Sequence, residues 1–184
     1  MASSTRSILD RIYLVYFVIH ILILFCVDLV PLYPSSLWVP GDSPLHFLFS
    51  LREYYIATYN DQFFLPPPAS IPSFFPLYAF LELVFHLPVS LWAVRAFGAG
   101  AGSRLSGSAE LLLLVYGVET ALTTLTCMYD IFLWDPAVVT AAQKSVLLGG
   151  LYGGYLALAV LLTIDMYARV LKRLNAGDAV KKRQ

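Results

Sequence analysis

Four long apolar stretches dominate the pattern of hydrophobic and polar positions along the chain. They run from about Ile12 to Val30, from Phe74 to Phe97, from Leu111 to Leu133 and from Val146 to Tyr167. Each is roughly 20 residues long with only isolated polar interruptions, which is the length that an α-helix needs to cross a bilayer. The pattern predicts an all-α membrane protein with a bundle of four transmembrane helices.

The segments between these spans are polar or rich in proline and aromatic residues. Pro31 and Pro34 end the first span, and residues 44–59 are expected to form an amphipathic helix on or over the membrane. A Gly/Ser-rich linker covers residues 98–108. The chain therefore divides into an N-terminal segment at 1–10, a four-helix transmembrane domain at 11–171 and a basic tail at 172–184.

Basic residues are distributed unequally between the two sides of the predicted membrane. One side carries Arg6, Arg11, Arg95, Arg104, Arg169, Lys172, Arg173, Lys181, Lys182 and Arg183, and the other only Arg52 and Lys144. The positive-inside rule makes the first side cytosolic, with both termini on it and residues 31–73 and 134–144 on the lumenal or outer side. Lys181 and Lys182 match a dilysine signal for retrieval to the endoplasmic reticulum. The alternative is a tail that only fixes topology and contacts anionic lipid.

Composition and charge exclude several functional classes. The chain is 59% hydrophobic, 13% charged and has a formal net charge of +0, so we expect no nucleic-acid partner. Cys26 and Cys127 lie inside apolar stretches without the spacing of a zinc site or disulfide framework. We expect neither a metal nor a cofactor. The first apolar run lacks a small-residue cleavage site, so it is read as an uncleaved span.

Acidic side chains inside the predicted spans are the main candidates for chemistry. A charged group at the centre of a membrane helix costs about 2.5–3.5 kcal/mol, so Glu82 and Glu119 are expected to face the bundle interior. His86 follows Glu82 by four residues, which would place both on one helical face where they can share a proton. An acidic pocket of this kind suits cationic apolar ligands. The alternative is that these residues only join helices through hydrogen bonds.

Other polar residues divide between this pocket and the membrane boundary. Asp28 and Asp61 either join the pocket or are simply solvated at its edge, whereas Asp130 and Asp165 lie near helix ends. Asp165 precedes Arg169 by four residues, which favours an interfacial ion pair. The pairs Gly149–Gly150 and Gly153–Gly154 flank Tyr152 and predict a close helix approach or space for a ligand.

Three motifs resemble a known family. They are Tyr16-Phe17 with His20 and Asp28-Leu29, then Tyr59-Asn60-Asp61 followed by Pro66-Pro67, and Glu82-Leu83-Val84-Phe85-His86-Leu87-Pro88. They resemble the sigma-2 receptor (transmembrane protein 97) family, within the EXPERA group that also includes the emopamil-binding sterol isomerases. The resemblance implies four helices around an occluded pocket, an endoplasmic-reticulum membrane location and a homodimer. It also implies binding of sterols or cationic amphiphilic small molecules, with a role in sterol and lipid homeostasis.

The resemblance also implies roles for individual residues. Asp28 corresponds to the carboxylate that meets a ligand amine, Asp61 to its lumenal support and Glu82 to an acidic partner. His86 and Glu119 depart from the family pattern, which has a glutamine and a histidine at these places. The predicted ligand-binding set is Asp28, Asp61, Glu82, His86, Glu119, Thr123, Tyr152 and Tyr155.

Two alternatives to a binding role stay open. Glu82, His86 and Glu119 would supply the proton donor and acceptor that a sterol Δ8-Δ7 isomerase needs. Fungal members of the group resemble an adaptor for quality control of non-imported mitochondrial precursors at the endoplasmic reticulum. Because the branch that the motifs resemble is regarded as binding rather than catalytic, we favour binding.

Overall fold

The computed structural model describes residues 2–65, 71–99 and 105–181, and every regular element among them is helical. Its α-helices are α1 (Ala2–Ile23), α2 (His46–Tyr59), α3 (Phe75–Leu81), α4 (Leu87–Gly98), α5 (Gly107–Leu133), α6 (Ala141–Ser145) and α7 (Tyr152–Lys181). Three π-helical turns continue these helices, η1 (Leu24–Asp28), η5 (Glu82–His86) and η6 (Val146–Leu151). Short 3-10 turns are η2 (Val30–Leu32), η3 (Ser35–Leu37) and η4 (Gln62–Phe64).

Four helical segments are long and apolar enough to cross a membrane, as the hydropathy pattern predicted. They are Ile8–Asp28, Phe75–Gly98, Gly107–Leu133 and Ala141–Gly177. The first and last helices are longer than the apolar runs, because the helix continues through polar flanks at 2–11 and 168–181. The flank at 168–181 is rich in alanine, leucine, lysine and arginine, which favour helix, and its charged residues keep it out of the apolar run.

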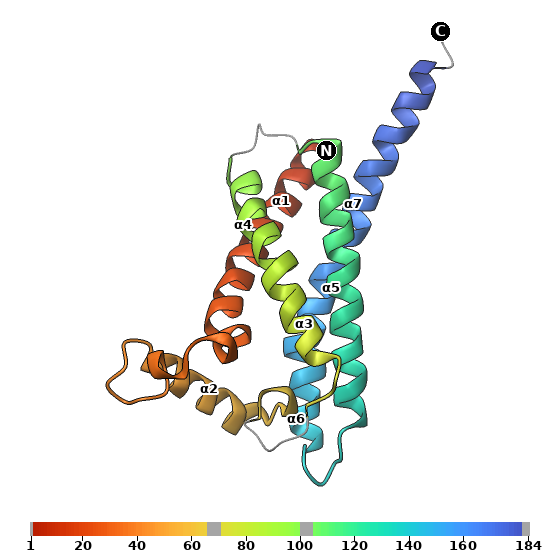
Figure 1. Ribbon diagram of the computed structural model, residues 1–184. Coiled ribbons are helices and arrows are strands. Elements are labelled where there is room, and N and C mark those ends of the chain that lie inside the picture. Colours follow the sequence, from red (N-terminus) through yellow and green to blue (C-terminus); the bar gives the residue numbers. More distant parts are fainter. Residues whose placement is uncertain (1, 66–70, 100–104, 182–184) are drawn as a thin grey trace.

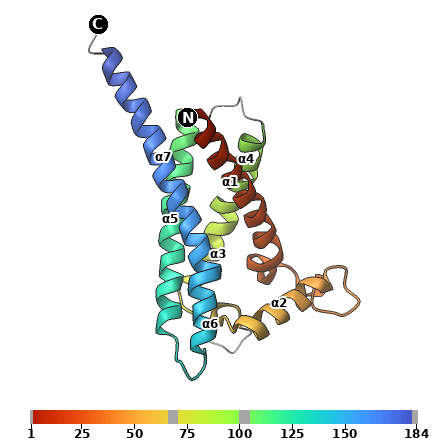
Figure 2. The same cartoon turned by 180° about the vertical axis from the view of Figure 1, so that it is seen from behind.

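Two helix pairs form the bundle. α1 packs mainly on α4 and α5 mainly on α7, while α3 crosses obliquely from the first pair towards the second (Figures 1 and 2). The start of α1 and the last turns of α7 lie at the same end of the bundle, which we name the terminal end. α2 lies across the opposite end, named here the α2 end, and confirms a helix within the expected range 44–59.

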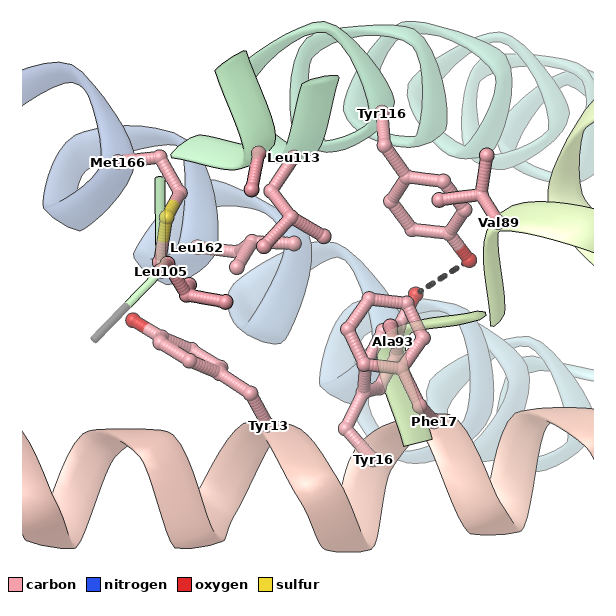
Figure 3. Close-up of a cluster of buried hydrophobic side chains, with 11 residues drawn as sticks. Tyr13, Tyr16, Phe17, Val89, Ala93, Leu105, Leu113, Tyr116, Leu162 and Met166 are labelled. Carbon is pink, nitrogen blue, oxygen red and sulfur yellow. Dashed lines mark hydrogen bonds between the residues drawn. The ribbon is translucent and has the colours of Figure 1, made fainter. Parts of the chain in front are cut away.

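A packed core fills the bundle toward its terminal end (Figure 3). Tyr13, Phe17, Leu113, Leu162 and Met166 are almost fully buried there. They come from α1, α5 and α7, so a single cluster joins the two helix pairs. This cluster supplies the main apolar contact that holds the bundle together.

α5 and α7 approach each other closely at Gly117. A Cβ atom there would lie 2.6 Å from Thr163 Oγ1 and 3.2 Å from the Ala159 carbonyl oxygen. The glycines at 149–150 and 153–154 were predicted to allow either a close helix approach or space for a ligand, and Gly149, Gly150 and Gly154 do not support the first alternative. A Cβ on Gly149, Gly150 or Gly154 would meet nothing within 4 Å.

Ion pairs tie α7 to its neighbours at the terminal end. Arg169 donates to Asp165 Oδ2 at 2.6 Å, the predicted pair, and to Asp10 Oδ1 at 2.7 Å. Arg173 pairs with Glu110 and donates to the Leu105 carbonyl oxygen at 2.6 Å. The partners of α7 in these pairs lie on α1 and at the start of α5, so one helix connects both.

A second apolar cluster closes the α2 end. It contains Phe63, Phe64, Cys127, Ile131, Val139 and Leu147. Asn60 ends α2 with a left-handed backbone at φ 52°, and its amide donates to the Val138 carbonyl oxygen at 2.7 Å. This contact ties the segment after α2 to the α5–α6 loop and thereby fixes the position of Asp61. Cys26 and Cys127 are both free thiols, as expected.

Candidate functional site

Three π turns distort the helices between the two apolar clusters. In each turn a backbone N–H reaches back five residues: Leu29 to Leu24, Leu87 to Glu82 and Tyr152 to Leu147. Such turns are rare and are frequent at functional sites, because the extra residue widens the helix and changes which side chains face inward. All three contribute residues to one cavity, from η1, η5 and η6.

The local sequence explains two of these turns. Pro88 has no N–H to offer the Val84 carbonyl, so the regular helical ladder cannot pass through η5. In η6 the Leu148 carbonyl oxygen would lie 2.1 Å from a Cβ on residue 153, so this position accepts only glycine. Gly153 therefore serves the π turn and not a helix–helix contact.

A cavity of about 460 Å³ lies within the bundle between the two clusters. This is within the range of roughly 300–1,000 Å³ that small-molecule sites occupy. Most of its walls are aromatic or aliphatic. Seven residues of the predicted ligand-binding set line it, namely Asp28, Glu82, His86, Glu119, Thr123, Tyr152 and Tyr155.

Several apolar residues that line the cavity are also exposed. Ile23 and Leu151 line it from α1 and η6, in two candidate membrane spans. Leu51 and Tyr54 of α2 line it at the α2 end and are also exposed.

Two acidic residues face the cavity without a protein partner. Within the described part of the chain, neither Asp28 nor Glu82 has a hydrogen bond or an ion pair, and their charges repel each other. Asp28 is the last residue of η1 and Glu82 the first of η5, so the two π turns bring them together. A buried carboxylate is normally paired, so this arrangement is suited to a cation supplied by a ligand.

Asp61 lies behind the cavity wall, unlike the other members of the predicted set. It is buried, and its carboxylate accepts from the hydroxyls of Tyr55 and Tyr152 at 2.9 Å each and from the Phe63 N–H at 3.1 Å. Burial raises the pKa of Asp61, whereas these hydrogen bonds and the nearby charge of Arg52 oppose the rise. Asp61 thus fixes two tyrosines that line the cavity.

His86 and Glu119 form a pair across two helices. The sequence predicted that His86 would share a proton with Glu82, and the structure corrects this: His86 Nε2 hydrogen-bonds Glu119 Oε2. The reason is the π turn, in which residues 82 and 86 are not stacked one turn apart as in a regular α-helix. The other two polar atoms of the pair, His86 Nδ1 and Glu119 Oε1, are buried and have no partner among the described residues.

Ring and hydroxyl groups surround this pair. The Tyr155 hydroxyl lies 2.6 Å from His20 Nδ1, and the rings of His20 and His86 meet edge to face at 5.7 Å. The Tyr116 ring lies 4.9 Å from His86, and its hydroxyl is 3.5 Å from that of Tyr16 (Figure 3). The sequence did not indicate Tyr116. Its position one turn before Thr120 in the acidic third span was the only available signal.

The remaining predicted residues carry less weight in the structure. The Thr123 hydroxyl donates to the Glu119 and Thr120 carbonyl oxygens at 3.0 and 3.2 Å, so its own helix satisfies it. Of the two lysines of the predicted retrieval signal, Lys181 is the last residue of α7 and Lys182 lies outside the described residues. Among the described residues, no three His, Cys, Asp or Glu side chains are grouped to hold a metal ion.

Comparison with known proteins gives consistent matches. Residues 47–166 match the family EXPERA (EXPanded EBP superfamily). The chain is 31% identical over 176 residues to the "Efficient mitochondria targeting-associated protein 19" of Schizosaccharomyces pombe, covering 96% of this chain and 84% of that protein. It is also 31% identical over 134 residues to the human "Sigma intracellular receptor 2", covering 73% of this chain and 68% of that protein. The Macaca fascicularis protein of the same name is 31% identical over 132 residues, covering 72% and 66%.

Proposed function

The chain belongs to the EXPERA family, the group that its motifs resembled, and from this premise we propose that it is a membrane receptor for amphiphilic amines or sterols. The ligand occupies the cavity between α1, α3, α5 and α7, with its basic nitrogen at Asp28 and Glu82. Binding there couples the protein to sterol and lipid homeostasis. The human relative's name describes a receptor, which supports a binding role.

The observation that carries this proposal is the pair of unpartnered carboxylates in an apolar cavity. Glu82 lies within one candidate membrane span and Asp28 at the end of another, and both line the apolar cavity, where an ionised group without a partner is costly. A ligand ammonium would supply the missing partner, while the aromatic walls would surround the rest of the ligand and attract its charge.

Saturation binding of a tritiated lipophilic tertiary amine to the purified full chain tests the proposal. Asp28→Asn should weaken binding by about tenfold or more, because it removes one partner of a desolvated charge pair. Asp42→Asn is the matched control, since Asp42 is exposed in the loop before α2. Unchanged affinity in Asp28→Asn would remove the assignment.

We place the protein in the endoplasmic-reticulum membrane, with the terminal end in the cytosol and the α2 end in the lumen. The distribution of lysine and arginine supports this orientation. An engineered glycosylation acceptor in the loop at 39–43 should be glycosylated, and one in the tail after α7 should not. The reverse pattern would invert the orientation. The homodimer that the resemblance implies is proposed as well, and cross-linking in native membranes tests it.

A sterol isomerase is the second candidate, favoured by the His86–Glu119 pair beside Glu82. Moving a double bond requires adding a proton at one carbon and removing another from a neighbouring carbon. The purified protein would then convert a Δ8 sterol to its Δ7 isomer, and Glu82→Gln would abolish turnover. Demonstrated sterol binding without conversion rejects this candidate.

An adaptor in mitochondrial protein quality control is the third candidate. It rests on the name of the Schizosaccharomyces pombe relative, which describes association with efficient mitochondria targeting. Under this function the partners of the protein are precursor proteins, and the cavity acids serve assembly. Cross-linked partners that are retained in Asp28→Asn and Glu82→Gln variants would favour it over the receptor.

A further inference from the structure

The charges on the cavity wall are not balanced. Asp28, Glu82 and Glu119 line the cavity, whereas no lysine or arginine lines it within the described part of the chain. The basic side chains on the wall are His20 and His86. His86 is paired with Glu119, and a ring nitrogen of His20 hydrogen-bonds a tyrosine hydroxyl of α7. The wall therefore provides no positive partner for Asp28 or Glu82.

Two more charged side chains, Asp61 and Arg52, lie close to the cavity without lining it. Asp61 accepts three hydrogen bonds, and the nearby charge of Arg52 favours its ionised form. The Arg52 guanidinium donates to the Phe64 carbonyl oxygen at 2.5 Å and lies 5.5 Å from the centre of the Phe64 ring. Arg52 thus compensates Asp61, and Asp28 and Glu82 stay without compensation.

The other titratable side chains on the wall carry no positive charge in any state. They are the thiol of Cys127 on α5 and the phenols of α2, α3 and α7, namely Tyr54, Tyr55, Tyr59, Tyr78, Tyr152 and Tyr155. Thiols and phenols are neutral near neutral pH and become negative only in alkali. Among the described residues, none of these groups can balance an ionised Asp28 or Glu82.

When no ligand is bound, protons are the counter-charge that Asp28 and Glu82 can still acquire. An isolated ionised carboxylate is so costly in an apolar environment that the group takes up a proton instead. Two carboxylates in one cavity also repel each other, so they titrate as a coupled pair and give up their last proton reluctantly. The empty cavity is therefore expected to hold at least one proton on this pair.

A ligand ammonium replaces that proton. An ion pair with the ammonium needs an ionised carboxylate, so the O–H bond of the carboxyl group breaks and the proton passes to water. The ammonium keeps its own proton and adds one positive charge, while the released proton takes one away. The net charge of the cavity is the same before and after binding.

We propose that the cavity exchanges a proton for an ammonium, so that each bound amine releases one proton from the Asp28–Glu82 pair. This inference rests on the proposed receptor function and adds a regulation of the same site by pH. The affinity should rise about tenfold per pH unit while the empty pair holds its proton and the amine stays charged. Above that range the affinity should become independent of pH.

Calorimetry on the purified full chain tests the exchange. A lipophilic tertiary amine is titrated near neutral pH in two buffers that differ in ionisation enthalpy, and the difference in observed heat gives the number of protons released. We expect close to one proton per bound amine. The N-methylated quaternary form of the same amine has no proton to lose, so it should also release about one. Asp42→Asn is the control variant, because Asp42 is exposed in the loop before α2.

Infrared spectroscopy of the empty protein identifies the source of the proton. A protonated carboxyl group has a carbonyl band that an ionised carboxylate lacks. This band should be weaker in Asp28→Asn/Glu82→Gln than in wild-type protein and unchanged in Asp42→Asn. If the double variant does not fold, the two single variants decide, and at least one of them should weaken the band.

The outcomes separate the exchange from the receptor function. Amine binding that depends on Asp28 but releases no proton would overturn the exchange and leave the receptor function standing. Release with the tertiary amine but not with a bound quaternary form would assign the proton to the ligand and overturn the exchange. A carbonyl band as strong in the folded variants as in wild-type protein would overturn it as well. If wild-type protein binds neither amine, both the receptor function and the exchange fail.

Discussion

The two halves of the bundle differ in whether their charged side chains are paired. At the terminal end, Arg169 is paired with Asp10 and Asp165, and Arg173 is paired with Glu110. In the cavity half, Asp28 and Glu82 have no protein partner among the described residues. The same helices carry both arrangements. The difference suggests that the terminal half is built for stability and the other half for a ligand that completes it.

Helix geometry also differs between the two halves: the terminal half is closely packed, and the cavity half contains the π turns. α5 and α7 approach closely at Gly117, where the core is packed. η1, η5 and η6 lie around the cavity, and each replaces a regular turn by a wider one. The distortions hold the helices around a hollow space without breaking the backbone hydrogen bonding that a membrane segment requires.

Removing Arg169 should have the largest effect on stability. Arg169→Met leaves Asp10 and Asp165 without their shared cation, and breaking a buried ion pair costs about 3–5 kcal/mol. We expect a large fall in the midpoint of thermal unfolding, measured by scanning fluorimetry in detergent. Lys172→Met is the control, because Lys172 is exposed in the same helix. Equal losses in both variants would remove the distinction between paired and solvated charge.

Crowding the α5–α7 contact should have the next largest effect. Gly117→Val forces the helices apart at Thr163, and such overpacking costs about 1–3 kcal/mol. The corresponding change at Gly154, where an added side chain meets open space, should be tolerated. The same unfolding assay compares the two. A fall at position 154 as large as that at 117 would refute the assignment of the close contact.

Adding a side chain at Gly153 should affect amine binding more than the stability of the fold. A methyl group at Gly153 collides with the Leu148 carbonyl, so the π turn must rearrange and Tyr152 must move. We expect Gly153→Ala to weaken amine binding about tenfold, equivalent to about 1.4 kcal/mol. Gly149→Ala is matched in size and meets no atom within 4 Å. Wild-type affinity in Gly153→Ala would separate the π turn from the site.

The smallest expected effect is a pH dependence that involves Asp61. Burial raises the pKa of Asp61 above its ordinary value of 3.8, so the folded protein holds this proton to higher pH than the unfolded chain does. Protonated Asp61 therefore stabilises the folded protein. This stabilisation is fully present when the pH lies below the ordinary pKa of an aspartate, and it is lost as the pH rises through the raised pKa of folded Asp61. Unfolding midpoints should therefore fall with increasing pH across this window, and Asp61→Asn should reduce that slope. A slope unchanged in the variant would assign the effect to another group.

The sequence predicted those features that depend on local composition. The four spans follow from hydropathy, and the inward position of Glu82 and Glu119 follows from the cost of exposing charge to lipid. The sequence could not predict features that depend on how helices rotate against each other. The His86–Glu119 pair requires the π turn at η5, and Asp10 and Arg169 meet across 159 positions in the chain. Glycine spacing alone did not indicate the contact at Gly117, because no second glycine at helical spacing marks it.

A structure of the protein with a bound lipophilic tertiary amine tests the central claim most directly. The account predicts the ligand nitrogen within hydrogen-bonding distance, about 3 Å, of a carboxylate oxygen of Asp28 or Glu82. The apolar part of the ligand should extend toward His86 and Glu119. A nitrogen bound beside His86 and Glu119 or outside the cavity, with Asp28 and Glu82 still unpartnered, would contradict the account.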